Sequence, residues 1–219
     1  MKVWLVARTC FPEETCGEAA SICVGKEGPN PAGLASAIES GHGSVLEHAV
    51  FTFRVEDLSR AALAQLTRHR IASFDVESQR YVPLNDPDFV IPESIENSEY
   101  AEQAKNVMRL AMQVYGWLMD AGVPCEDARY VTPQAVPTKL LVTMNARELH
   151  HFFALRCCNR AQWEIRELAD KLLEICKEEA PSLFMKCGPG CVRERCPEKR
   201  PCGHPRAGED LFMEDPDAS

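Results

Sequence analysis

Strand and helix patterns follow one another irregularly along this chain, and that order limits the folds open to it. Residues 2–8 alternate apolar and polar side chains, and residues 48–55 are rich in β-branched and aromatic residues, so both predict strands. Residues 138–144 predict a third strand, and long helices are expected over 98–121 and 162–178. Because these patterns do not alternate regularly, we expect an α+β fold, with a mixed or antiparallel sheet packed against long helices, rather than a doubly wound sheet.

Polar residues predict where several helices begin. Asn30 followed by Pro31 is typical of a helix start, with proline in the first helical position. Asp57 is expected to cap a helix that carries Gln65 at its C-terminal end. Asn145 and Glu148 have the spacing of a capping box at the start of a further helix.

The bulk composition bounds the class of protein. With 219 residues and 45% apolar side chains, the chain can bury one ordinary core with a small appendage. No apolar run approaches the roughly 20 residues that cross a bilayer, and residues 1–8 are too short for a signal peptide, so we expect a cytoplasmic protein. The net charge of −9 disfavours a nucleic-acid partner, which calls for a broad basic face.

A local cationic segment stands out against this acidic background. Residues 68–81 hold three arginines, a histidine and two serines. Guanidinium groups present planar donor forks that match phosphate and carboxylate oxygens, and hydroxyl groups complete such a cradle. A local cluster on an acidic protein predicts a local anion, so a phosphorylated small molecule is favoured.

This segment resembles the signature of the flavin-dependent thymidylate synthases. In that signature Arg-His-Arg is followed at fixed spacing by Ser, Asn, Ser and Arg-Tyr, and only Asp75 departs from it, in place of Asn. Val76 stands where the family often has Glu. Residues 41–53 and 145–166 resemble two further polar blocks of the family, so the resemblance covers about residues 15 to 185.

The resemblance implies a thymidylate-synthase-complementing type fold over residues 1–185, followed by a Cys-rich tail over 186–219. It implies reductive methylation of dUMP to dTMP, with 5,10-methylenetetrahydrofolate as carbon donor and FAD reduced by NADPH. It also implies a homotetramer whose active sites are shared between subunits. No Gly-x-Gly-x-x-Gly follows a strand, so FAD is not expected on a Rossmann unit.

The resemblance further implies which residues act. Arg156 is the catalytic candidate, because a guanidinium at the polar edge of the pyrimidine would stabilise developing negative charge. With Arg156, the implied dUMP-binding residues are Gln65, Arg68, Val76, Glu77, Ser78, Gln79, Arg80 and Arg129. The implied FAD-binding residues are His42, Ser44, Arg68, His69, Arg70, Asn145, Arg147 and His151.

Four of the eleven cysteines crowd into the tail. Cys187, Cys191, Cys196 and Cys202 suit Zn(II), which prefers tetrahedral thiolate ligation, and His204 could replace one thiol. The intervals of three, four and five residues are not those of a typical zinc ribbon. An iron–sulfur cluster and a disordered tail without metal remain as alternatives.

Two other functions compete with the family resemblance. A metal-binding nucleic-acid or regulatory module could be built on the cysteine tail, with contacts from Arg193, Arg195, Lys199 and Arg200. A relative with the same fold could instead act on another substrate, because Asp75 and Val76 alter a ligand-facing loop. Bound flavin would favour either enzyme over the metal-binding module. Tritium release from C5-labelled dUMP would then distinguish a thymidylate synthase from a relative that acts on another substrate.

Overall fold

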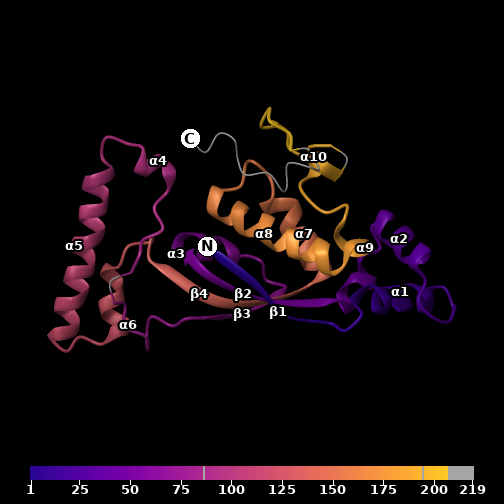
Figure 1. Ribbon diagram of the computed structural model, residues 1–219, viewed down its shortest axis with the longest axis horizontal. Coiled ribbons are helices and arrows are strands. Elements are labelled where there is room, and N and C mark those ends of the chain that lie inside the picture. Colours follow the sequence, from indigo (N-terminus) through magenta and orange to yellow (C-terminus); the bar gives the residue numbers. More distant parts are fainter. Residues whose placement is uncertain (86, 194, 207–219) are drawn as a thin grey trace. The chain divides into compact units, whose positions relative to one another are not determined.

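One antiparallel sheet organises the protein, seen here in a computed structural model that describes residues 1–85, 87–193 and 195–206 (Figure 1). Its strands follow the order β1 (Lys2–Arg8), β2 (Val50–Ser59), β4 (Pro137–Asn145) and β3 (Ala72–Val76). The amide of Thr9 donates to the carbonyl of Val50, so the end of β1 meets the beginning of β2. The amide of Glu77 donates to the carbonyl of Lys139, so the end of β3 meets the beginning of β4. Both pairs are therefore antiparallel. The expected α+β class is confirmed.

The described residues divide into two compact units. The first consists of residues 1–2, 55–67 and 75–140, and the second of residues 3–54, 68–74 and 141 onward. Residues 186–206 of the tail group with the second unit. The predicted boundary between residues 185 and 186 stays a prediction.

Helices of the first unit follow β2 and precede β4. They are α3 (Arg60–Leu66), α4 (Glu93–Glu96), α5 (Ala101–Asp120), α6 (Cys125–Ala128) and the 3-10 helix η2 (Arg129–Val131). The expected long helix is therefore confirmed as α5, which begins three residues later than the pattern indicated. On α5, Tyr115 is buried, and its hydroxyl accepts a hydrogen bond from the Leu84 amide at 3.2 Å.

The helix start expected at Asp57 is wrong. Asp57 lies inside β2 with φ of 61° and pairs with Lys2 at 3.1 Å. The strand continues to Ser59, whose hydroxyl accepts from the Ala62 amide at 3.0 Å and caps α3. Ser59 takes this role because its position leaves its oxygen facing the unpaired amides of the first turn.

The second unit holds the remaining helices. They are α1 (Pro12–Cys23), α2 (Pro31–Glu39), the 3-10 helix η1 (Gly43–His48), α7 (Ala146–Arg156), α8 (Trp163–Glu179), α9 (Pro181–Phe184) and α10 (Gly190–Arg193). The predicted start of α2 is confirmed, because the Asn30 side chain accepts from the Gly33 amide at 2.8 Å. The patterns did not predict α1. Helices α7 and α8 lie side by side (Figure 1).

Aromatic side chains anchor α7 in the core of the second unit. Phe51 of β2 meets Phe184 edge-on, with ring centroids 5.4 Å apart, and Phe153 of α7 lies 6.1 Å from the same ring. Phe152 packs against Phe153 at 5.8 Å, and all four rings are fully buried. Helix α7 therefore offers a rigid base for the polar side chains that it carries.

None of the helices within the described ranges has the length and apolar character required to cross a membrane.

Candidate functional site

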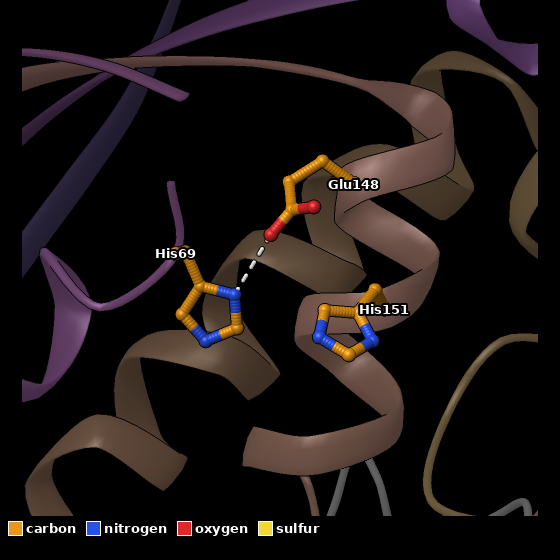
Figure 2. Close-up of side chains that lie close together, drawn as sticks. All are labelled: His69, Glu148 and His151. Atoms are coloured by element: carbon orange, nitrogen blue, oxygen red, sulfur yellow. Dashed lines mark hydrogen bonds and ion pairs between the residues drawn. The ribbon is translucent and has the colours of Figure 1, made fainter. Parts of the chain in front are cut away.

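A buried polar chain in the second unit joins α7 to the segment between α3 and β3. His69 comes from that segment and is 4% exposed, while Glu148 on α7 is 6% exposed (Figure 2). The Nδ1 atom of His69 lies 2.8 Å from Oε1 of Glu148, and Nε of Arg156 donates to Nε2 of His69 at 3.1 Å. The chain thus joins two residues of α7 to a histidine from a distant part of the sequence.

The spacing on α7 explains this arrangement. Glu148, Phe152 and Arg156 are four residues apart in turn, so they lie on one face of the helix. The ring of Phe152 meets His69 edge-on at 4.9 Å, between the two polar partners. Asn145 begins the helix, because its side chain accepts from the Glu148 amide at 2.9 Å. The predicted Asn145 cap is confirmed, but the Glu148 carboxylate bonds His69 and not the start of its own helix.

The hydrogen bonds assign the proton on His69. An arginine Nε–H can only donate, so Nε2 of His69 must accept and Nδ1 must carry the proton that is donated to Glu148. Burial lowers the pKa of His69 below its usual value; the bond to Glu148 opposes this shift, and the charge of Arg156 adds to it. The histidine is therefore a neutral link between a carboxylate and a guanidinium.

The same place could be mistaken for a metal centre. Among the described residues, His69, Glu148 and His151 form the one group of three potential ligands whose atoms all lie within 4.8 Å of one another. Both nitrogens of His69 already have partners, and the adjacent Arg156 cation would repel a metal ion. The geometry therefore favours a hydrogen-bonded chain over a metal site.

Several predicted FAD-binding residues do meet in the second unit. His42 and Ser44 are exposed at the start of η1. Arg147 packs on Gly43, where an added Cβ would lie 3.2 Å from its Nε, and pairs with Glu47 of η1. An exposed guanidinium beside a histidine and a hydroxyl suits the phosphate and carbonyl groups of a dinucleotide cofactor.

The other predicted FAD-binding residues vary in accessibility. Arg68, Arg70 and His151 are exposed in the same unit. Asn145 is occupied with capping α7, and His69 has partners at both ring nitrogens. Their assignment to FAD stays a prediction.

Two of the predicted nucleotide-binding residues, Gln79 and Arg129, line a polar pocket of the first unit. The pocket measures about 370 Å³ and is lined by Arg60, Gln79, Arg129, Tyr130, Thr132, Pro133 and Gln134. Nε of Arg60 and Nε2 of Gln79 are buried and have no hydrogen-bond partner within the described part of the chain. Two unpaired buried donors beside a second guanidinium call for an acceptor ligand, because such groups are costly to leave unsatisfied.

Arg60 is a pocket residue that the sequence reasoning missed. Its Nη2 donates to the carbonyl of Glu77 at 2.9 Å, which fixes the side chain against the residue that follows β3. Burial lowers the pKa of Arg60; the charge of Glu77 opposes this shift, and the charge of Arg129 adds to it. The one sequence signal was its place directly after the cap of α3, close ahead of the cationic segment.

Other predicted nucleotide-binding residues already have protein partners. The Glu77 amide donates to Lys139 at 3.0 Å, and its carboxylate pairs with the Lys139 ammonium at 2.8 Å. Arg80 pairs with Glu126 at 2.8 Å, and the Ser78 hydroxyl accepts from the Arg80 amide at 3.2 Å.

The remaining members of the set differ in exposure. Gln65 and Val76 are half-buried, and Arg68 is exposed. Asp75 is exposed on β3, where water screens its charge. All of these assignments to dUMP stay predictions.

The four tail cysteines do not gather around one point. No group of potential metal ligands within residues 1–85, 87–193 and 195–206 includes them. The Cys187 thiol is buried and donates to the carbonyl of Leu183, while Cys202 is exposed beside His204. The zinc site stays a prediction.

The sequence matches known proteins over nearly its whole length. Residues 2–182 match the family described as thymidylate synthase complementing protein. A protein of Geobacter sulfurreducens is 45% identical over 98% of this chain and 99% of its own length, and one of Clostridium tetani is 38% identical over 97% of both. A protein of Thermococcus onnurineus is 52% identical over 72% of this chain and 69% of its own length. All three are named flavin-dependent thymidylate synthase.

These matches account for the polar blocks that a nucleic-acid or regulatory module on the cysteine tail would leave unexplained. The chain belongs to the flavin-dependent thymidylate synthase family, the family of thymidylate synthase complementing proteins.

Proposed function

We propose that this protein methylates dUMP to dTMP, with 5,10-methylenetetrahydrofolate as carbon donor and FAD reduced by NADPH as the source of reducing equivalents. The names of its relatives support thymidylate synthesis with a flavin. The pocket of the first unit supports a phosphorylated substrate, and the exposed cations of the second unit support a dinucleotide cofactor. A homotetramer whose active sites are shared between subunits is part of this proposal.

The observation that carries the proposal is the pair of guanidiniums in the pocket. Arg60 and Arg129 both line it, and Arg60 together with Gln79 brings buried N–H groups without partners. A phosphate monoester carries close to two negative charges near neutral pH and offers several strong acceptors. It would satisfy both donors and offset the repulsion between the two cations. Arg68 and Arg80 add positive charge elsewhere in the proposed nucleotide-binding set.

FAD would be held in the second unit by His42, Ser44 and Arg147, with Arg70 and His151 as further contacts. The flavin supplies the redox chemistry, while the protein binds and orients it. Arg156 acts on the substrate: a guanidinium aimed at the polar edge of the uracil ring stabilises the negative charge that develops there when C5 becomes nucleophilic. The donor fork of Arg156 is oriented by its bond to His69.

A comparison of the Kd values for dUMP and for deoxyuridine tests whether Arg60 binds the phosphate. The variant Arg60→Met keeps an unbranched side chain but removes the guanidinium and its charge. One charge-assisted hydrogen bond contributes about 1.5–3 kcal/mol, so we expect the Kd for dUMP to rise about tenfold to a hundredfold. Deoxyuridine has no phosphate, so its Kd should be unchanged.

Arg109→Gln is the matched control, because Arg109 is on the surface of α5, where it bonds Asn106. Both Kd values should stay at the wild-type level in this variant. If Arg60→Met raised the Kd for dUMP and for deoxyuridine by the same factor, Arg60 would not bind the phosphate.

The reaction itself is tested with purified protein and FAD. Under anaerobic conditions, NADPH should bleach the flavin, and added methylenetetrahydrofolate and dUMP should yield dTMP with release of tritium from C5. Bleaching without dTMP would favour the reading in which Asp75 and Val76 changed the substrate. A protein that cannot be reconstituted with FAD would refute the proposal.

A further inference from the structure

We propose that Glu148 and His69 are positioning residues that orient Arg156 for the reaction, and that they work through the protonation of one ring nitrogen. The inference rests on the proposed function only in that Arg156 is taken to face the pyrimidine. The hydrogen-bonded chain itself is a property of the described residues, and Figure 2 shows its bond between His69 and Glu148.

The chain has one consistent arrangement of protons. Glu148 accepts from Nδ1–H of His69, which leaves Nε2 as a bare acceptor for Nε–H of Arg156. If the proton moved to Nε2, two donors would face each other and the bond to Arg156 would be lost. Glu148 therefore selects the tautomer, and the tautomer holds the arginine.

The bond at Nε matters because the guanidinium is planar. A partner at Nε sets the plane in which the remaining N–H groups of Arg156 lie. Phe152 supports the imidazole ring edge-on at 4.9 Å, so the ring cannot tilt without losing this contact. The buried framework thus orients the guanidinium in advance. Less free energy is then needed to align its N–H groups when negative charge develops on the substrate.

Burial of Glu148 is hard to explain by packing alone. A carboxylate that is 6% exposed is costly in a protein interior unless it is paired or hydrogen-bonded, and an apolar side chain would fill this place without that cost. In this geometry His69 offers no ring nitrogen to a cofactor, because each of them already has a protein partner. The arrangement resembles the use of a buried carboxylate to fix the tautomer and orientation of a catalytic histidine.

The tautomer is measured by NMR of protein labelled with ¹⁵N-histidine, with the His69 signals assigned by their loss in His69→Gln. In the wild type we expect a protonated Nδ1 and a bare Nε2. In Glu148→Met, which keeps the size of the side chain but offers no acceptor, Nε2 should gain the proton. In Glu148→Gln the amide oxygen can still accept, so the wild-type pattern should persist.

Turnover is measured on the same variants. We expect kcat to fall about tenfold to a hundredfold in Glu148→Met, with the KM for dUMP within about threefold of wild type, because the lost interaction acts in the transition state. Glu148→Gln should restore most of this loss. The control is Glu167→Gln on α8, where the half-buried carboxylate pairs with Lys171; this variant should match the wild type in both measurements.

A second pair of variants tests the direction of the chain. In His69→Asn the side-chain amide would lie near the position of Nδ1 of the histidine. In His69→Gln the longer side chain would place its amide near the position of Nε2. His69→Gln can still accept from Arg156, so its kcat should exceed that of His69→Asn. The opposite order would overturn the proposal.

Other results also overturn it. They are a kcat within about threefold of wild type in Glu148→Met, an unchanged tautomer despite a fall in kcat, and a loss of bound flavin in proportion to the loss of activity. If the wild type makes no dTMP, the proposed function fails. The NMR experiment needs no substrate, so a His69 tautomer that responds to Glu148→Met would still support the chain.

Discussion

An ion pair that ties the tail to α8 gives the sharpest prediction for stability. Nη1 of Arg206 lies 2.9 Å from both carboxylate oxygens of Asp170 and donates to the carbonyl of Cys157 at 2.9 Å. The two side chains are 10% and 23% exposed. Burial raises the pKa of Asp170, while Arg206 opposes that shift. The variant Arg206→Met would leave a carboxylate mostly buried without its cation.

The expected cost follows from this burial. Removal of one partner from a fully buried pair costs about 3–5 kcal/mol, and the remaining solvent contact of Asp170 lowers our expectation to about 2–3 kcal/mol near pH 8. Without Arg206 the pKa of Asp170 rises further. As the pH falls, the folded carboxyl then takes up a proton before the unfolded one, and this favours the folded state. The destabilisation should therefore be smaller at about pH 5.

Urea unfolding followed by far-ultraviolet circular dichroism measures this effect. Asp170→Asn combined with Arg206→Met should lose less stability than the sum of the two single variants, because the neutral amide leaves no buried charge. Lys186→Gln is the control, since its pair with Glu39 is exposed and should not measurably affect stability. An equal loss at both pH values, or additive single effects, would refute the role of the ion pair.

Three further predictions concern the second unit. Asn145→Ala should lower the free energy of unfolding by about 1 kcal/mol through loss of the α7 cap, and no loss in urea unfolding would contradict that role. Burial lowers the pKa of His150 and of His69, so stability should fall as the pH drops below about 6.5, where the unfolded histidines take up protons. His150→Gln, which can still donate to the carbonyl of Leu183, should flatten that slope; an unchanged slope would exclude His150 as a contributor. In thiol labelling followed by mass spectrometry, exposed Cys10 should react in the folded protein, whereas Cys187, whose pKa burial raises to about 12, should react only after unfolding; early labelling of Cys187 would contradict its burial.

Local patterns in the sequence predicted the elements whose signals lie close together in the chain. Asn30 and Asn145 each cap the helix that follows, because the side-chain oxygen needs only the amide three residues later. Strand β4 and the long helices α5 and α8 follow from the strand pattern and from helical periodicity. The family resemblance, based on polar residues at fixed spacing, predicted the family that the comparisons show.

Tertiary structure decided what depends on distant partners. Asp57 looked like a cap, but its strand continues two residues further, and Ser59 meets the free amides instead. Strand β3 was not predicted although its five residues alternate between apolar and polar. Such a short pattern does not show the pairing with β4, a distant part of the sequence, that makes this segment a strand.

The polar sites show the same division. The sequence alone pointed to His69, Arg129 and Arg156, since their residue types match a spaced motif. It could not assign Glu148 to His69, 79 residues away, nor place Arg60 in the pocket with Arg129. Hydrogen bonds and burial depend on which atoms meet after the chain has folded, and the spacing of residues along the chain does not contain that information.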